Sequence, residues 1–218
     1  MSSKSQFTRA DVDVVEDITV FDGFWELAAV KLRHRLFAGG WSSVVQRELH
    51  RRGSAAGVLL YDPILDAVGM LEQFRVGALN SADGNPWLME LVAGLVEAGE
   101  SPEEVAQRES VEEAGCTLKS IEPIADYYSS PGGSDEYFYL YCGITDLSAV
   151  KELHGLEHEN EDIRLHVIRY EELEALIAAG RFNNAHSLLA LQWLEKHRPR
   201  LRAVDDPEYG ALAGPADE

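Results

Sequence analysis

A helix with explicit start and stop signals lies near the middle of this 218-residue chain. Ser101 is a favourable N-cap residue, Pro102 suits the first helical position, and Glu104 completes a capping box with Ser101. Gly115 readily takes the left-handed conformation that ends many helices. These signals predict a helix over residues 102–114. Because runs that suit strands flank it on both sides, the chain is expected to fold as a mixed α and β domain.

The rest of the chain alternates between apolar or β-branched runs and turn-forming segments. Strands are expected over residues 14–20, 24–36, 42–49, 55–61, 66–75, 87–93, 117–128, 136–143 and 163–169, and further helices over residues 170–179 and 183–197. Gly39-Gly40 predicts a turn, residues 151–162 an acidic loop, and residues 203–218 a disordered tail. The order favours a small N-terminal β unit followed by a larger α/β domain.

The net charge restricts the partners of the chain. Lys and Arg total 19 against 38 Asp and Glu, a formal net charge of −19, which argues against binding to nucleic acid or to an anionic membrane. Residues 31–52 are an exception, because they hold six cations and one acid. There is no apolar run of about 18 residues and no N-terminal signal sequence, so a cytoplasmic location is expected. Two cysteines are too few for a disulfide framework.

Three carboxylates share one face of the predicted helix. At about 100° per residue, Glu113 lies about 40° from Glu109, and Glu112 about 60° to the other side. Like charges at this spacing destabilise a helix, and Arg108 is the only cation of the segment. The charges alone leave two interpretations open: a solvated acidic helix, or a site for Mg²⁺, which prefers carboxylate and carbonyl oxygens.

The spacing of seven residues distinguishes these interpretations. The segment resembles the box motif of the Nudix family at Gly94, Glu100, Arg108, Glu109, Glu112, Glu113 and Gly115. Ser110 departs from the pattern, because the family prefers a larger hydrophobe there. The resemblance implies an α/β/α sandwich with mixed β-sheets, here preceded by a small N-terminal antiparallel β unit. It further implies hydrolysis of a nucleoside diphosphate linked to another moiety.

The resemblance also implies the metal ligands. Glu109, Glu112 and Glu113 would bind Mg²⁺, together with the carbonyl of Ala93 and with Glu161. The site would hold about two or three Mg²⁺ ions, with Mn²⁺ as a substitute. Arg108 would pair with an acid of the box, for which Glu100 is one candidate.

Over about residues 13–197 the resemblance is to the bacterial ADP-ribose pyrophosphatase subgroup. That subgroup has a proline about sixteen residues beyond the box, and Pro131 lies 131 − 115 = 16 residues beyond Gly115. The alternative interpretation of this loop, SSPGGSD, is an ordinary hairpin turn. The subgroup takes its general base from a second acidic loop, which aligns Glu159 with that role. Spacing alone leaves Glu157 and Glu161 open for the same role.

Further substrate contacts follow from the subgroup. Its N-terminal β unit is exchanged between the two subunits of a homodimer, so that Phe24 and Trp25 would stack on adenine. The other implied contacts are Arg47, Glu48, Arg52, Arg75, Leu95 through its backbone, Ser130, Pro131, Gly132 and Glu136. Without the resemblance, Phe24 and Trp25 would be interpreted as core residues.

The expected organisation has three parts. Residues 1–53 form the dimerisation unit, residues 54–200 the hydrolase domain, and residues 201–218 the tail. The expected reaction is Mg²⁺-dependent hydrolysis of ADP-ribose to AMP and ribose 5-phosphate. The alternatives are hydrolysis of another nucleotide sugar such as GDP-mannose, or a non-catalytic module that senses ADP-ribose. Against the sensor stand the complete set of box glutamates and the absence of room for a DNA-binding domain after the last helix.

Overall fold

The computed structural model describes residues 6–82, 84–155 and 160–204. The strands are β1 (Val12–Asp22), β2 (Glu26–His34), β3 (Val45–Arg51), β4 (Ser54–Asp62), β5 (Ala67–Phe74), β6 (Trp87–Glu90), β7 (Val92–Leu95), β8 (Ser120–Tyr128), β9 (Tyr137–Ile144), β10 (Leu153–His154) and β11 (Ile163–Arg169). The helices are α1 (Pro102–Ala114), α2 (Tyr170–Ala178) and α3 (Ala185–Val204). By its internal contacts the chain divides into two units, Met1–Ser54 with Tyr128–Tyr137, and the remainder.

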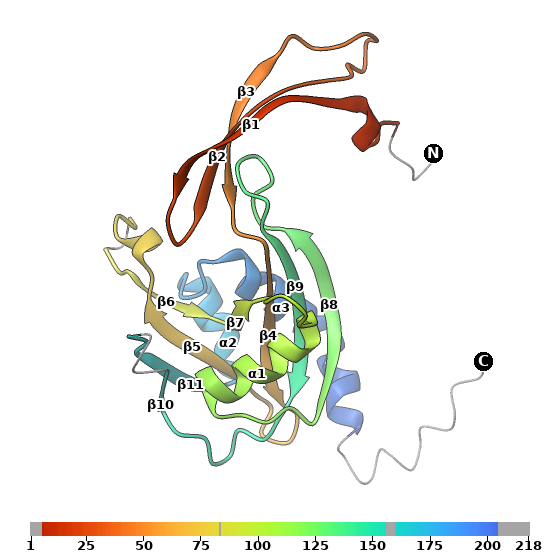
Figure 1. Cartoon of the computed structure of the whole chain (residues 1–218). Coiled ribbons are helices and arrows are strands. Elements are labelled where there is room, and N and C mark those ends of the chain that lie inside the picture. Colours follow the sequence, from red (N-terminus) through yellow and green to blue (C-terminus); the bar gives the residue numbers. More distant parts are fainter. Residues whose placement is uncertain (1–5, 83, 156–159, 205–218) are drawn as a thin grey trace, which may run out of the picture. The chain divides into compact units, whose positions relative to one another are not determined.

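The larger unit is built on an eight-stranded sheet with helices on both faces (Figure 1). The strand order is β10-β11-β5-β4-β9-β8, with β6 added to β5 and β7 added to β4. On one face Val105 and Ala106 of α1 pack with Leu71 of β5 in one apolar cluster. On the other face Leu173 of α2 and Leu194 of α3 belong to a second cluster. The predicted α/β/α sandwich is confirmed.

The smaller unit is an antiparallel sheet of β1, β2 and β3. The loop 128–137 joins it through the backbone, because the His50 N–H donates to the Gly133 carbonyl at 2.8 Å and the Asp135 N–H to the His50 carbonyl at 3.2 Å. The Asp135 carboxylate also accepts from the Arg52 N–H at 2.7 Å. The SSPGGSD loop is therefore held by the N-terminal sheet, an association that sequence spacing did not indicate.

Local signals predicted α1 correctly. The Ser101 hydroxyl accepts from the Glu104 N–H, the Glu104 carboxylate accepts from the Ser101 N–H, and Gly115 closes the helix at φ 61°. The capping box and the left-handed C-cap fix both ends by contacts a few residues apart. The helix spans residues 102–114, as predicted.

Three predicted elements needed correction. The single strand over residues 87–93 is two strands, because the chain leaves β5 and crosses to β4 at Leu91. The acidic loop 151–162 contains the short strand β10, which pairs with β11. The last helix continues past Pro199 to Val204, so residues 201–204 are helical rather than part of the tail. Burial of Leu201 and the ion pair of Arg198 with Asp66 support the helix beyond its proline.

Other expectations have mixed outcomes. Cys116 and Cys142 are free and buried. Phe24 is 85% exposed, so its interpretation as a core residue is wrong. No helix in the described part of the chain is long and apolar enough to cross a membrane. The tail beyond residue 204 lies outside the described residues, and nothing tests its predicted disorder.

Candidate active site

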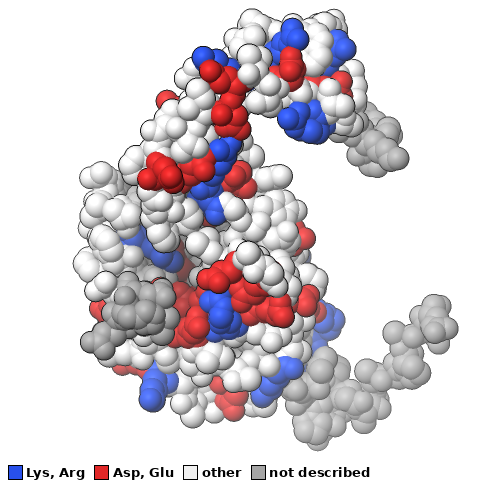
Figure 2. Space-filling view, viewed as in Figure 1, with Lys and Arg blue, Asp and Glu red and all other residues white. Residues whose placement is uncertain are grey.

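Arg108 is the centre of an ion-pair network that joins the segment before α1 to the helix. Its Nε and Nη2 donate to the two carboxylate oxygens of Glu100 at 2.9 and 3.1 Å. Its Nη1 donates to Glu109 at 2.6 Å and to Glu112 at 3.1 Å. These pairs raise the pKa of Arg108, with Glu100 the largest contributor, so the guanidinium stays charged. Figure 2 shows acidic surface next to a small basic patch in the region where Figure 1 draws α1.

Gly94 is required by close packing against the helix. A Cβ atom at this position would lie 1.7 Å from Glu109 Oε1 and 2.3 Å from Glu109 Cδ. No side chain fits at such distances, so any substitution displaces either β7 or the Glu109 carboxylate. The glycine of the motif therefore sets the position of a predicted ligand.

Glu113 is a buried carboxyl group that forms no ion pair with any of the described residues. Only 4% of the residue is exposed, and its Oε2 accepts a hydrogen bond from the Ala93 N–H at 2.9 Å. Burial is the main cause that raises its pKa to about 8, and the charges of Glu109 and Glu161 raise it further. Burial also raises the pKa of Glu109. A buried carboxylate is costly unless a cation or several donors compensate it.

The donor set fits a hard divalent cation. Carboxylates from α1 lie next to a backbone segment, β7, that offers carbonyl oxygens, and Mg²⁺ prefers oxygen ligands. As the side chains stand, no three His, Cys, Asp or Glu residues in the described ranges meet in a metal-binding arrangement. The hydrogen bonds of Glu109 and Glu112 to Arg108 account for part of this, because they direct both carboxylates toward the guanidinium.

Glu161 comes to this cluster from a distant part of the sequence. Its charge raises the pKa values of both Glu109 and Glu113, after burial as the main cause, which places it near the box carboxylates. The Glu161 backbone packs against Gly155, where a Cβ atom would lie 2.6 Å from the Glu161 carbonyl oxygen. The predicted base Glu159 and the alternative Glu157 lie outside the described residues.

Arg75 extends the site along the sheet. Its Nε donates to Glu90 at 2.7 Å, and its charge slightly offsets the raised pKa of Glu113. Glu90 was not predicted as part of the site. The sequence offered one indication, because Glu90 lies in the short run WLME next to the box. Nothing in the residue spacing, however, pairs Glu90 with Arg75. Leu95, the predicted backbone contact, lies at the end of β7 opposite Ala55.

The smaller unit brings together a second group of predicted residues. The Arg52 guanidinium lies 4.5 Å from the ring centre of Trp25 and pairs with Glu136 at 3.2 Å. Phe24 makes an edge contact with Trp25 at 4.7 Å. Glu136 is buried and accepts from the Ser129 hydroxyl. The arrangement is an aromatic surface with a charged edge, which suits a purine base and an anion.

The remaining predicted residues of this unit are exposed. Arg47 and Glu48 lie on β3, where Arg47 Nη1 donates to the neighbouring Gln46 carbonyl at 2.8 Å. Ser130, Pro131 and Gly132 form an exposed turn, in which the Ser130 carbonyl accepts from the Gly133 N–H at 3.2 Å and the Ser134 N–H at 3.0 Å.

The contacts of Ser110 explain why a polar residue is tolerated where the family prefers a larger hydrophobe. The residue is fully buried, and its hydroxyl donates to the Ala106 carbonyl at 2.6 Å. The backbone of the preceding turn therefore satisfies the polar group, which reduces the cost of placing serine where a hydrophobe is preferred. Within the described ranges, Ser110 makes no hydrogen bond to the predicted ligands or to Arg108.

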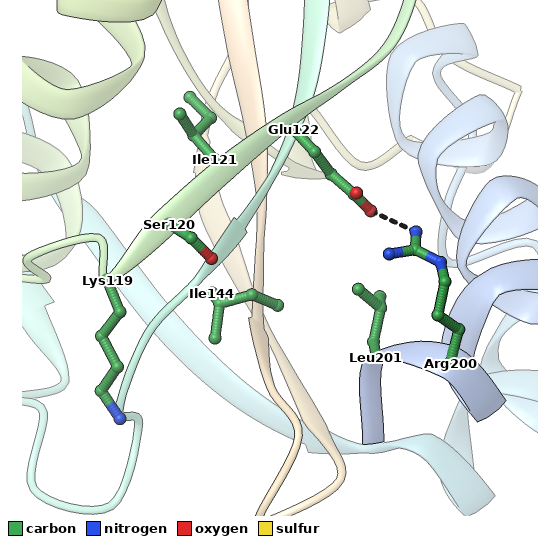
Figure 3. A pocket seen from close by; sticks show the side chains of 7 residues that line it. All are labelled: Lys119, Ser120, Ile121, Glu122, Ile144, Arg200 and Leu201. Atoms are coloured by element: carbon green, nitrogen blue, oxygen red, sulfur yellow. Dashed lines mark hydrogen bonds and ion pairs between the residues drawn. The ribbon is translucent and has the colours of Figure 1, made fainter. Parts of the chain in front are cut away.

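Two hollows lie in the larger unit. One of about 290 Å³ is bounded by the start of β8, the end of β9 and the end of α3, where Arg200 pairs with Glu122 (Figure 3). None of the predicted site residues lines it. A second, of about 620 Å³, lies at the end of α1 and includes Glu112, Gly115 and His154. The second hollow thus adjoins the carboxylate cluster.

Comparison with known proteins decides the family. The sequence model of the NUDIX domain matches residues 51–191. This chain belongs to the NUDIX family. The carboxylate cluster on α1 is therefore the Nudix box, and the protein is a Nudix hydrolase.

Named relatives of this Nudix protein cover almost its whole length. It is 41% identical over 204 residues to the ADP-ribose pyrophosphatase of Haemophilus influenzae, an alignment that covers 93% of this chain and 94% of that protein. It is 42% identical over 196 residues to the ADP-ribose pyrophosphatase of Escherichia coli K12, covering 90% and 93%. The GDP-mannose pyrophosphatase of an Enterobacter species is 30% identical over 151 residues, covering 69% and 78%.

A solved structure supports the Nudix fold. A protein described as an ADP compounds hydrolase matches with a TM-score of 0.67 and 19% sequence identity. The match covers 92% of this chain and 100% of that chain. At this identity the likeness concerns the fold, which is the α/β/α sandwich with its added strands.

Proposed function

We propose that this Nudix hydrolase cleaves the diphosphate of ADP-ribose to AMP and ribose 5-phosphate, with Mg²⁺ as its metal. The choice of ADP-ribose as substrate rests on the 41–42% identity to ADP-ribose pyrophosphatases over at least 90% of the chain. The chemistry is supported by the box cluster, where Glu113 is buried and has no ion-pair partner among the described residues.

The proposed metal ligands are Glu109, Glu112, Glu113, Glu161 and the carbonyl of Ala93. When bound, Mg²⁺ would neutralise the diphosphate and lower the pKa of a water molecule. The chain itself positions the carboxylates: Gly94 leaves the space that Glu109 occupies, and the Ala93 N–H orients Glu113. The Arg108 network holds the segment 94–100 against α1, so that the backbone and the helix present their oxygens together.

Glu159 is the proposed general base. It belongs to the segment between Gly155 and Glu161, whose backbones pack together beside the carboxylate cluster. A carboxylate from this segment would accept the proton of the attacking water. Glu157 and Glu161 are the alternatives, so Glu159→Gln should reduce turnover more than Glu157→Gln does.

Residues of both units are proposed to bind the nucleotide. In the smaller unit Phe24, Trp25, Arg47, Glu48, Arg52, Ser130, Pro131, Gly132 and Glu136 would contact adenine, ribose or phosphate, and in the larger unit Arg75 and the Leu95 backbone. The support is physical: Trp25 offers a flat face beside the Arg52 guanidinium, and Phe24 is exposed.

A homodimer with an exchanged N-terminal unit is proposed. The three-stranded sheet exposes large apolar side chains, among them Val15 at 57%, Val20 at 57% and Phe21 at 62%. Several large apolar side chains exposed on one small sheet favour an interaction site in a folded protein. A second copy of the chain is the proposed partner.

The test is a substrate panel with product analysis. The purified protein should release AMP from ADP-ribose in the presence of Mg²⁺, with a higher kcat/KM than for GDP-mannose. Turnover in ¹⁸O-water would show which phosphorus is attacked, since the label enters only that product. A higher kcat/KM for GDP-mannose would reject the proposed substrate, and tight binding of ADP-ribose without AMP release would indicate a sensor.

A further inference from the structure

Gln73 is a buried amide without a hydrogen-bond partner. Only 6% of the residue is exposed, and its Nε2 has no partner among the described residues. Buried polar groups are nearly always paired, because an unpaired donor loses its hydrogen bonds to water and gains nothing. An unpaired amide at this depth therefore needs an explanation.

The position of Gln73 on β5 shows which face of the sheet its side chain is on. Alternate residues of a strand point to the same face. Leu71, two residues before Gln73, packs with Val105 of α1, so Gln73 lies on the face that carries the Nudix box. Arg75, two residues after it, continues this row and pairs with Glu90.

The side chains directly beside Gln73 on this face cannot accept a hydrogen bond, and the carboxylate of Glu90, which lies diagonal to it, accepts from Arg75 instead. Leu88 of β6 is paired directly with Gln73, and on the other side the register Arg164↔Glu72 places Ile163 of β11 beside it. Along its own strand the neighbours are Leu71 and Arg75. Three of the four side chains are apolar and the fourth carries only donors. The acceptor must come from outside this row.

The row runs from the core toward the site of the proposed reaction. Ile163, which lies beside Gln73, is two residues from the proposed metal ligand Glu161, and Arg75 follows Gln73 in the same row. A phosphate group that reaches both Arg75 and a cation on the box carboxylates would bring acceptor oxygens to this end of β5. Phosphoryl oxygens are strong acceptors, and a bond from an amide to a charged oxygen is stronger than a neutral one.

We propose that the Gln73 amide donates a hydrogen bond to a phosphoryl oxygen of the diphosphate substrate, next to Arg75. The inference rests on the proposed function for the identity of that substrate. A neutral donor suits this place for an electrostatic reason. A lysine here would pair with the nearby carboxylates, as Arg108 does with Glu109 and Glu112, and would compete with the cation. An amide binds the phosphate without neutralising the ligands.

The decisive variant is Gln73→Met, which keeps the length of the side chain and removes the donor. We expect kcat/KM for ADP-ribose to fall about 10- to 100-fold, the usual effect of losing a hydrogen bond to a charged group. The thermal midpoint should stay the same or rise, because an unpaired buried amide is replaced by an apolar group. The Mg²⁺ concentration for half-maximal activity should not change. The matched control is Gln192→Met, an exposed glutamine on α3, which should leave all three unchanged.

A second measurement separates this inference from the proposed function. Binding of inorganic pyrophosphate with Mg²⁺, followed by calorimetry, needs no turnover and should weaken about tenfold in Gln73→Met. If the unmodified protein does not cleave ADP-ribose, the proposed function fails and pyrophosphate binding alone decides the role of Gln73. Activity and pyrophosphate binding within twofold of the unmodified protein would overturn the inference. A thermal midpoint several degrees lower would also overturn it, since Gln73 would then have a structural partner.

Discussion

Helix α1 and the three-stranded sheet differ in the kind of group that lacks a favourable partner. On the helix it is a buried carboxylate, and on the sheet it is exposed apolar side chains. On α1 the carboxylate of Glu113 is buried beside a single backbone donor, while the only large hydrophobe exposed on the helix is Val111. On the sheet several charges are paired across strands, as in Lys31 with Glu16 and Arg33 with Asp13.

Exposed apolar side chains show the opposite distribution, because they are few on α1 and many on the sheet. In the sheet only Ala28 and Val30 are buried among the apolar residues, and β1 has no buried residue at all. A sheet without a core face of its own needs another surface to cover it. This difference is the reason for proposing a cation as the partner of the helix and another protein surface as the partner of the sheet.

The largest effect should follow from removing a box carboxylate. Glu113→Gln keeps the shape of the side chain and removes its charge, so turnover of ADP-ribose with Mg²⁺ should fall about 10²- to 10³-fold. The matched control is Glu103→Gln, an exposed acid in the first turn of the same helix. Equal activities of Glu113→Gln and Glu103→Gln in steady-state assays would contradict a role for Glu113 in turnover.

The pH dependence of stability tests the same carboxyl group without turnover. The pKa of Glu113 is raised from 4.5 to about 8, so the folded state binds this proton more tightly than the unfolded state. Protonation of Glu113 therefore contributes fully to the free energy of unfolding below pH 4.5, and this contribution is lost as the pH rises toward 8. With about 1.4 kcal/mol per unit, the loss in metal-free protein is about 3–5 kcal/mol.

Thermal unfolding across this range measures the loss. Glu113→Gln should flatten the dependence, and the thermal shift caused by Mg²⁺ should be larger at pH 8 than at pH 5 because ligand carboxylates must be ionised. A Mg²⁺ shift that is independent of pH would contradict the assignment of Glu113 as a ligand.

Close packing at Gly94 gives the next effect. Gly94→Ala places a methyl group on the Glu109 carboxylate and should lower kcat/KM about 10- to 100-fold, since displacement of a site by about 1 Å has effects of this size. Gly77→Ala is the control, because a Cβ atom there meets nothing within 4 Å and no positive φ is recorded for Gly77. The prediction fails if the two alanine variants have the same kinetics.

The smallest effect concerns the sheet. Phe21→Ser removes an exposed ring from β1 and should weaken the proposed dimer about tenfold, as for an interface residue of moderate importance. Val111→Ser on the exposed side of α1 should leave the mass unchanged. Light scattering over a range of concentrations measures both, and a fully active monomer would reject the exchanged dimer.

The accuracy of the sequence predictions followed the range of the contacts involved. The ends of α1 depend on partners within a few residues, and both were predicted correctly. The break at Leu91 depends on which strands β6 and β7 join, which alternating hydrophobicity cannot show. The continuation of α3 past Pro199 depends on Asp66, more than 130 residues away in the chain.

The sequence by itself determined the box spacing, the bounds of its helix and hence the family, because these are patterns in adjacent residues. Only the tertiary structure decided that Glu113 is buried, that Arg75 pairs with Glu90, and that the loop 128–137 is held by the N-terminal sheet. It also decided that the Gln73 amide nitrogen has no hydrogen-bond partner in the described part of the chain. The physical reason is that burial and hydrogen bonding depend on which distant segments of the chain meet. A different neighbouring strand would change both the burial of a side chain and its hydrogen-bond partners.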